Sequence, residues 1–208
     1  MPERFGEIVE GLRDRIESLH NARENALAAG RQIVQTSSKA IKHIHRQEMD
    51  RADSLLKSLE QMVTKASHDV ASFPGIRHAP YFQDAIKEFV EAKTLRAIIM
   101  NEPLPLPQEL NVEPQAYLNG ICEAASECRR YALDEVRRGN NERARELATE
   151  MEDIYDELIT FDYPDALMSN LRRNVDALRA VLERTQSDLA VTGTQRELID
   201  ELRRSRPQ

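Results

Sequence analysis

The stretch PYFQDAIKEFVEAKTLRAIIM, residues 80–100, decides the fold. Asp84, Glu88 and Glu91 recur at i, i+4 and i+7, so on an α-helix the three acids share one face. The opposite face carries apolar side chains: Phe82, Ile86, Phe89 and Val90. The helical line of the acids then continues into further apolar residues: Leu95, Ile98 and Ile99. A helix that is apolar on both sides is expected to be packed on both sides.

Carboxylates that point into such packing are rarely buried unless they are paired or bind a metal. A second helix, predicted over residues 114–138, repeats the pattern, with Glu123 and Glu127 at i, i+4 and Arg130 on the same side. If the two helices lie antiparallel, they supply four carboxylates, which repel one another unless a cation lies between them. Oxygen ligands without a thiolate favour Mg²⁺ or Mn²⁺. The alternative is that both acidic faces are solvated faces of amphipathic helices.

Other metal and catalytic centres fit the sequence poorly. Di-iron bundles also place glutamates inside paired helices, but they need a Glu-x-x-His pattern. The segment Glu88-Phe89-Val90-Glu91 carries a glutamate where that histidine is required. The chain also contains no Gly-rich phosphate loop and no Ser/His/Asp or Cys/His arrangement of a nucleophile. The carboxylates are therefore the candidates for chemistry.

Composition favours one all-α domain spanning residues 1–208. Only 7 of the 208 residues are glycine, which leaves little room for the turns of an all-β fold. No apolar run reaches 18 residues, so no membrane span is predicted. The first residues are charged from the third position onward and lack the apolar core of a signal peptide. A cytoplasmic protein is expected.

Apolar residues at helical spacing predict seven helices in an elongated bundle with a very long first helix. That helix, over residues 3–46, measures about 65 Å at about 1.5 Å per residue, and a break is expected near Gln47–Met49. A second helix ends at Phe73-Pro74-Gly75. The remaining helices are predicted over residues 80–100, 114–138 and 142–159, from Pro164 to about 190, and over 195–204. The segment Val191-Thr192-Gly193-Thr194 is expected to interrupt the last two.

The two cysteines, Cys122 and Cys128, lie six residues apart on one predicted helix. Their Cα atoms are then about 9 Å apart along the helix axis, which is too far for a disulfide. They are expected to be small buried apolar residues in a reducing compartment.

A net charge of −7 argues against a surface covered with nucleic-acid-binding residues, but it leaves room for a segregated basic patch. Near the end of the first helix, Lys39, Lys42, His43 and Arg46 share one face, whereas His45 lies off that face. Such a stripe can contact phosphates. The alternative is an ordinary solvent-facing charged stripe. Arg77 and His78 add a smaller basic group on a loop before the acidic helix.

Taken together, these segments resemble the translin and translin-associated factor X family, in particular its prokaryotic members. The resemblance covers nearly the whole chain and rests on several short motifs in a fixed order. They are Ser38-Lys39-Ala40-Ile41, Ile44-His45-Arg46, Ala85-Ile86-Lys87-Glu88-Phe89-Val90-Glu91-Ala92, Tyr117-Leu118-Asn119-Gly120-Ile121, Glu127-Cys128-Arg129-Arg130, Met151-Glu152-Asp153-Ile154-Tyr155 and Phe161-Asp162-Tyr163-Pro164.

The nuclease branch of this family is similar to this chain at the acidic helix, where it carries Gln-Glu-Tyr-Val-Glu-Ala. Glu88 and Glu91 match its glutamate pair, Glu123 matches a later acid that is usually Asp, and Glu127 matches the glutamate beyond it. The translin branch lacks the first pair. The Glu-for-Asp change at position 123 lengthens that ligand by one methylene.

The resemblance implies a metal-dependent endoribonuclease that acts on single-stranded RNA, and also on short single-stranded DNA, inside a hollow homo-octamer. It implies that Glu88, Glu91, Glu123 and Glu127 hold Mg²⁺ or Mn²⁺ and that Arg130 stabilises charge on the phosphate. The residues implied to position the nucleic-acid backbone are Lys39, Lys42, His45, Arg46 and Arg77. Two alternatives remain: a binding protein of the same fold that does not cut, and a helical scaffold without a nucleic-acid partner.

Overall fold

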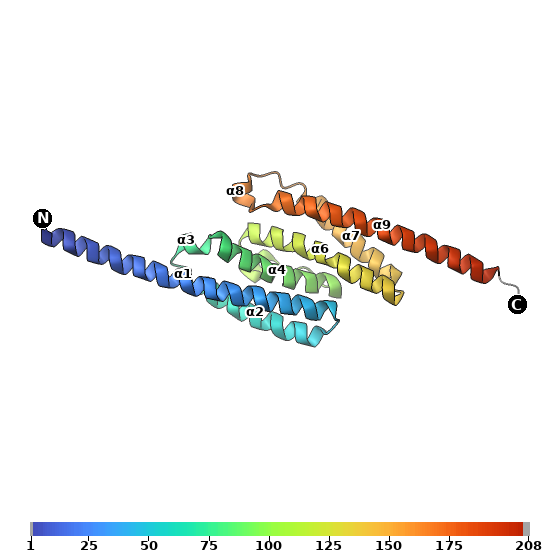
Figure 1. The fold of residues 1–208 in the computed structure, drawn as a ribbon, viewed down its shortest axis with the longest axis horizontal. Coiled ribbons are helices and arrows are strands. Elements are labelled where there is room, and N and C mark those ends of the chain that lie inside the picture. The colour runs from blue at the N-terminus through green and yellow to red at the C-terminus, as the bar shows by residue number, and fades with distance from the viewer. Residues whose placement is uncertain (1, 206–208) are drawn as a thin grey trace.

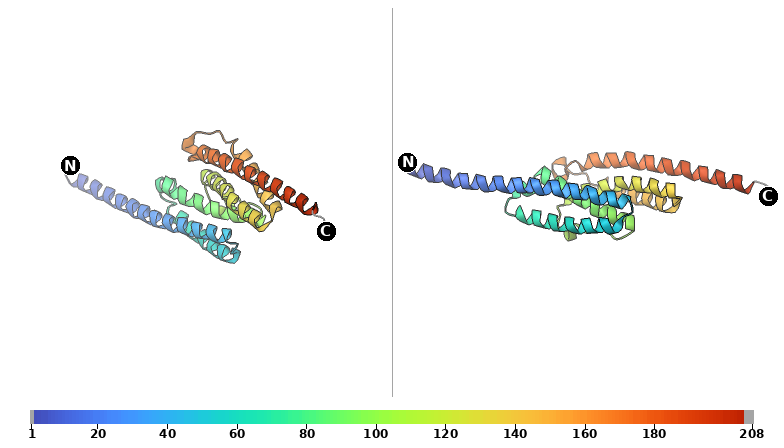
Figure 2. Two further views of the ribbon diagram at one scale, coloured as in Figure 1. Left: turned by 45° about the vertical axis from the view of Figure 1, so that its right-hand side comes forward. Right: turned by 60° about the horizontal axis from the view of Figure 1, so that its bottom comes forward.

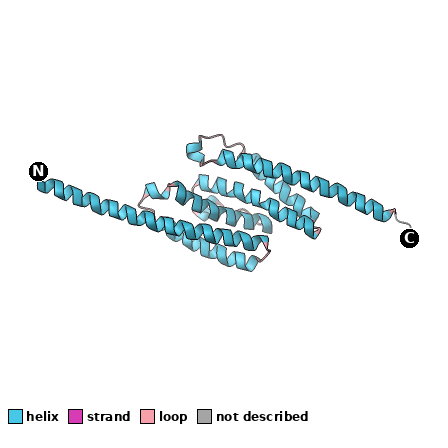
Figure 3. Ribbon diagram, viewed as in Figure 1, coloured by secondary structure: helices cyan, strands magenta, loops and turns pink. Residues whose placement is uncertain are grey.

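The structure, a computed structural model, describes residues 2–205, with side chains at 4–196, 198, 199 and 201–205. Positions 1 and 206–208, which the predicted domain includes, lie outside this part. Within it every regular element is a helix and no strand occurs (Figure 3). The all-α prediction is therefore confirmed.

In the described residues, six long helices form an elongated bundle (Figure 1). They are α1 Pro2–His45, α2 Met49–Asp69, α4 Pro80–Met100, α6 Pro114–Arg138, α7 Asn141–Leu158 and α9 Leu171–Arg204. Three one-turn helices lie in the connections: α3 Pro74–Arg77, α5 Pro107–Leu110 and α8 Asp165–Met168. The very long first helix is confirmed, and α1 ends where the break was expected, because Gln47 adopts a left-handed conformation with φ 59°.

The predicted interruption at Val191–Thr194 is wrong, because α9 continues through it. The hydroxyl groups of Thr192 and Thr194 donate to the carbonyl oxygens of Asp188 and Ala190, at 2.8 and 3.2 Å, so both bond within the helix. A single helix-interior glycine, Gly193, costs only about 1 kcal/mol relative to alanine. The two helices predicted at the end of the chain are therefore one.

Helix α4 lies at the centre and contributes to both hydrophobic clusters. Its first half packs with α1 and α2, where Phe82 and Phe89 meet Ile33 and Leu59. Its second half packs mainly with α6, where Leu95 joins a cluster that includes Leu147 and Met151 of α7 and Leu178 of α9. The packing on both sides expected from the sequence is present. Any acid on α4 that does not face solvent must therefore lie near a seam between these clusters.

Helices α4 and α6 run parallel, so the expected antiparallel arrangement is wrong (Figures 1 and 2). Gly120, early in α6, lies against Val90 in the middle of α4. Arg143, just beyond the end of α6, donates a hydrogen bond of 2.6 Å to the carbonyl oxygen of Ile98 near the end of α4. The connection 101–113 returns the chain: thirteen residues reach about 40 Å when extended, whereas α4 measures about 30 Å.

The first half of α1 and the last part of α9 extend beyond the bundle at opposite ends (Figure 2). Both extensions expose apolar side chains: Phe5, Ile8, Leu12, Ile16 and Leu19 on α1, and Val191, Leu198, Ile199 and Leu202 on α9. In the part of the chain that the structure describes, no helix is long and apolar enough to cross a membrane.

Both cysteines are free and buried, as the sequence predicted. Burial raises the pKa of Cys122 to about 12 and raises that of Cys128 further. Neither thiol is therefore a nucleophile at neutral pH.

Candidate metal centre and nucleic-acid interface

A glycine brings the two acidic helices together. A Cβ atom at Gly120 would lie 2.6 Å from the Cβ of Val90 and 2.8 Å from the carbonyl oxygen of Lys87. Real Cβ contacts are not this short, so the backbones of α4 and α6 approach as closely as they do because position 120 has no side chain. The acids that follow on α6 consequently lie close to those on α4.

Three of the four predicted carboxylates meet at this crossing. Glu88 and Glu91 of α4 and Glu123 of α6 each place a carboxylate oxygen within 4.8 Å of the others. Glu91 is the most enclosed, with 8 % of its surface exposed, and it accepts no side-chain hydrogen bond from any described residue. A buried carboxylate without a partner is costly. The donor set, three carboxylate oxygens and no thiolate, therefore fits Mg²⁺ or Mn²⁺.

Burial and the negative charges of the neighbouring carboxylates raise the pKa values of Glu88 and Glu91. Burial, reinforced by the charges of Glu88, Glu123 and Glu127, raises the pKa of Glu91 to about 8. Burial also raises the pKa of Glu88, although the neighbouring Lys87 opposes that shift. At neutral pH and without a cation, Glu91 is therefore mostly protonated. A divalent ion between these groups reverses the balance.

Glu127 stands apart from this group because a histidine holds it. The Nε2 atom of His45 lies 2.7 Å from Oε2 of Glu127, and this hydrogen bond lowers the pKa of the Glu127 carboxyl. The His45 side chain is only 2 % exposed. His45 was predicted to contact RNA, but the structure buries it against Glu127. The signal was present in the sequence, because His45 lies off the basic face of its helix.

Lys87, a residue without an assigned role in the sequence, lies inside the cluster. Its ammonium nitrogen is 2.7 Å from Oε1 of Glu123 and 3.4 Å from Oε1 of Glu88. Burial disfavours the charged form, but the hydrogen bond to Glu123 and the two carboxylate charges outweigh it and raise the pKa of Lys87. The one signal for it was its position beside Glu88.

Two asparagines connect the cluster to the start of α9. Nδ2 of Asn174 donates to Oδ1 of Asn119 at 2.8 Å and lies 3.4 Å from Oε1 of Glu123. Asn119, which is buried, donates in turn to the carbonyl oxygen of Met168 at 2.8 Å. Because these residues come from α6, α8 and α9, no local spacing in the sequence predicted the contact.

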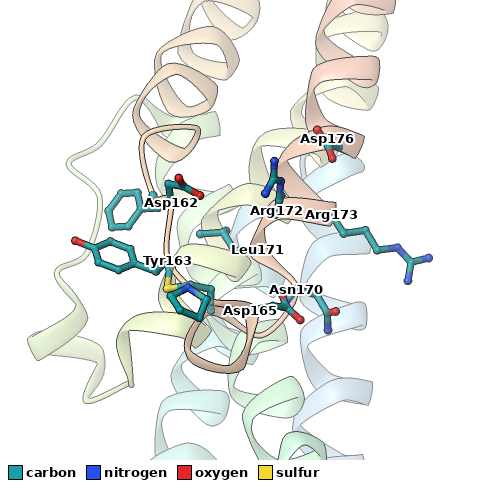
Figure 4. Close-up of a pocket in the computed structure, with 11 residues that line it drawn as sticks. Asp162, Tyr163, Asp165, Asn170, Leu171, Arg172, Arg173 and Asp176 are labelled. Carbon is teal, nitrogen blue, oxygen red and sulfur yellow. The ribbon is translucent and has the colours of Figure 1, made fainter.

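A cavity of about 710 Å³ lies beside this connection, between the loop before α8 and the first turns of α9 (Figure 4). Phe161 and Tyr163 expose their rings there, with centroids 6.5 Å apart. Arg172 and Arg173 also line it, and neither makes an ion pair with another residue in the described range. Tyr163 and Arg173 point to opposite sides of the cavity (Figure 4). The cavity thus offers both aromatic faces and free guanidinium groups.

The other predicted cations are not gathered at one place. Arg130 is exposed and close enough to help lower the pKa of Glu127. Lys39 and Lys42 are exposed on the last turns of α1, and Arg46 is exposed directly after its end. Arg77 lies on α3, at the opposite end of the bundle (Figure 1), and donates 3.0 Å to Glu113. Five residues were predicted to contact the nucleic-acid backbone. Lys39, Lys42 and Arg46 lie together, whereas His45 is buried and Arg77 lies at the other end of the bundle.

Comparison with known proteins gives the family. The chain is 28% identical over 186 residues to an uncharacterized protein of Methanocaldococcus jannaschii. The match covers 88% of this chain and 82% of that protein. Two solved structures of AfC3PO, one in complex with duplex RNA, are 34% identical and superpose with a TM-score of 0.83 over 90% of this chain. They are covered over 97% and 98% of their own lengths.

The structure of apo-NeC3PO, at 21% identity and a TM-score of 0.81, shares the fold; the match covers 88% of this chain and 96% of that one. The family model described as Translin family matches residues 7–187. The matched range contains all of the long helix α4, the carboxylates and the start of α9. The chain belongs to the translin family.

Proposed function

We propose that this chain is a metal-dependent endoribonuclease that cuts single-stranded RNA within a homo-oligomer. The observation that carries the proposal is the meeting of Glu88, Glu91 and Glu123 within 4.8 Å of one another at the crossing of α4 and α6. Buried carboxylates in such a group are costly unless they bind a cation. The family membership supports RNA as the substrate class, since a 34% identical relative is described in complex with duplex RNA.

Glu88, Glu91 and Glu123 would hold the Mg²⁺ or Mn²⁺ ion. His45 keeps Glu127 ionised and oriented beside them, as outer partners of metal-binding carboxylates do. Asn174 restrains Glu123 from the other side. When bound, the ion neutralises charge on the scissile phosphate and lowers the pKa of an attacking water molecule.

The cations of the chain bind and orient the RNA. Arg130, exposed beside Glu127, stabilises negative charge on the phosphate. Lys39, Lys42 and Arg46 contact the RNA backbone along α1 without selecting a base sequence. Arg77 adds a contact only when it exchanges its partner Glu113 for phosphate.

Self-association follows from the exposed apolar residues of the two helical extensions. On α1, Phe5, Ile8, Leu12, Ile16 and Leu19 fall on one face at helical spacing. Such a stripe, on a helix that extends away from its own core, marks an interface. The octamer implied by the family resemblance would close this surface and place the carboxylates in its interior.

A cleavage assay with a labelled RNA tests the proposal. Single-stranded RNA, duplex RNA and single-stranded DNA are incubated with purified protein in Mg²⁺, Mn²⁺ or EDTA. We expect cleavage of the single-stranded RNA in either metal and none in EDTA. Glu91→Gln and Glu123→Gln should abolish cleavage while RNA binding persists, and Glu60→Gln, outside the cluster, should not. No cleavage in any metal by pure wild-type protein contradicts the proposal.

A second candidate is an RNA-binding protein of the same fold that does not cut. The observation that favours it is Lys87, whose ammonium group already neutralises part of the charge of Glu88 and Glu123. In that case the protein retains RNA in EDTA and in metal alike, and cleaves it in neither. If RNA retention is absent even at low ionic strength, both candidates fail and a helical scaffold remains.

A further inference from the structure

Lys87 occupies the part of the carboxylate cluster that a cation is expected to take. Its ammonium nitrogen lies 2.7 Å from Glu123 and 3.4 Å from Glu88, two of the three acids of the group. The Lys87 side chain is only 19% exposed, so it is largely enclosed by the protein. Glu91, the third acid, makes no such contact.

We propose that Lys87 is a built-in counter-cation of the cluster: it holds Glu88 and Glu123 together in the metal-free protein, and it must release Glu123 when a divalent ion binds. The contact between Lys87 and Glu123 thereby sets the metal affinity of this chain. This inference rests on the proposed function, because it concerns the same carboxylates.

The first step of the argument is charge. Three carboxyl groups lie within 4.8 Å of one another, and those that are ionised repel in the metal-free state. A single ammonium group in contact with two of them lowers that repulsion. The same group then opposes the binding of a second cation to the same oxygens, because like charges a few ångströms apart in a half-buried site repel strongly. Stability without metal and affinity for metal are therefore opposed at this residue.

The second step is reach. Lys87 precedes Glu88 on α4, and its contact with α6 depends on the close approach at Gly120. Lys87 and Glu123 both have long side chains, of opposite charge, and their charged groups are in contact. The metal-free contact is therefore a property of this pair.

Lys93 provides a matched control. It lies on the same helix, and its ammonium group pairs with Glu60 of α2, away from the cluster. Replacement of Lys93 by glutamine removes the same charge from α4 and leaves the carboxylates untouched. Lys87→Arg keeps the charge near the cluster and serves as a second comparison.

Isothermal titration with Mn²⁺ and thermal melting in EDTA test the inference without any assay of activity. We expect Lys87→Gln to bind Mn²⁺ at least about 10-fold more tightly than wild type and to melt at a lower temperature in EDTA. The melting difference should shrink at saturating Mn²⁺. Lys93→Gln should leave the Mn²⁺ affinity unchanged within about 2-fold, and Lys87→Arg within about 3-fold.

The outcomes separate this inference from the proposed function. If wild type binds Mn²⁺ and Lys87→Gln binds it equally or more weakly, the inference is overturned and the enzyme proposal stands. If wild type binds no Mn²⁺ but Lys87→Gln does, the inference holds and the proposal of a metal-dependent enzyme fails for the natural sequence. If neither binds, both are overturned. A Lys87→Gln protein that fails to fold in EDTA supports the inference only if Mn²⁺ restores its melting transition.

Discussion

The Nε2 atom of His45 lies 2.7 Å from Oε2 of Glu127, joining the last turn of α1 to the middle of α6 across 82 residues of sequence. Because a carboxylate only accepts hydrogen bonds, Nε2 carries the proton. The other ring nitrogen, Nδ1, is buried and has no hydrogen-bond partner among the described residues. The hydrogen bond from this buried histidine fixes where the carboxylate of Glu127 points.

We therefore expect His45→Gln to weaken Mn²⁺ binding by about 10-fold, a typical loss when an outer partner of a metal site is removed. Titration calorimetry measures the change. His43→Gln is the matched control: His43 lies two residues away and pairs with Glu48, on the outside of the bundle, at 2.5 Å. Equal Mn²⁺ affinities for the two variants would show that Glu127 does not depend on His45.

Gly120→Ala should destabilise the protein by about 1–3 kcal/mol, the usual cost of overpacking. The added methyl group meets Val90 and the backbone of Lys87, so α4 and α6 must move apart. Chemical denaturation in EDTA measures the loss. Gly75→Ala, where a Cβ meets nothing within 4 Å, should change stability by less than about 0.5 kcal/mol. Comparable losses at both positions would contradict the role of the close approach.

The metal-free protein should lose stability as the pH rises toward 8. The pKa of Glu91 is about 8 in the folded protein and 4.5 in its ordinary state, so between these values the folded chain holds the additional proton. Stability from this group is full below about pH 4.5, declines between about pH 4.5 and 8, and is lost above about pH 8. Thermal melting in EDTA from pH 5 to 8 should show wild type losing stability relative to Glu91→Gln, which keeps no titrating group there.

The same proton predicts an effect on metal binding. At pH 7 a divalent ion must displace the proton of Glu91, so Mn²⁺ affinity should rise with pH until about 8. Calorimetry in two buffers of different ionisation enthalpy reports the proton released. A pH-independent difference from Glu91→Gln in melting, together with no proton release, would contradict the raised pKa.

The basic residues of α1 should dominate the salt dependence of RNA binding. Each contact with a single-stranded phosphate contributes about 0.7 to the slope of log affinity against log salt concentration. Replacing Lys39, Lys42 and Arg46 together by alanine should therefore lower the slope by about 2. Filter binding at several salt concentrations measures it. Lys65, Arg137 and Arg179, exposed residues that already pair with carboxylates, form the control set and should change it little.

A charge on the apolar stripe of α1 should dissociate the proposed oligomer. Leu12→Glu and Ile16→Glu place carboxylates among side chains that are 52 % and 66 % exposed in the single chain. Asn21→Glu adds the same charge on the opposite side of α1 and is the control. Light scattering should show a smaller mass for the first two variants only. An unchanged mass would remove this stripe from the interface.

Several features were set by the sequence itself, because they depend on local rules. Helical spacing predicted the long helices, and the proline-rich segment after Met100 ended α4 where expected. Residues 80–100, apolar on two sides, indicated a central helix that carries acids at a seam. Local rules failed at Gly193, where two threonines bond within the helix and α9 continues.

The spacing of the acids along each helix also predicted the carboxylate pairs, and the family resemblance implied that they bind a metal. Which carboxylates meet was decided only by the tertiary structure. The parallel course of α4 and α6 depends on the length of the connection between them, and their distance depends on the missing side chain of Gly120. The parallel course and the close approach bring Glu123 to Glu88 and Glu91 and place Lys87 among them. Glu127 instead accepts a hydrogen bond from His45.

Periodicity along one helix specifies a face and its chemistry. It carries no information on the partner across that face, because contacts between helices are set by packing between residues far apart in the chain. The sequence thus determined that this protein is a helical bundle with acids inside. The fold decided which of those acids meet at one place.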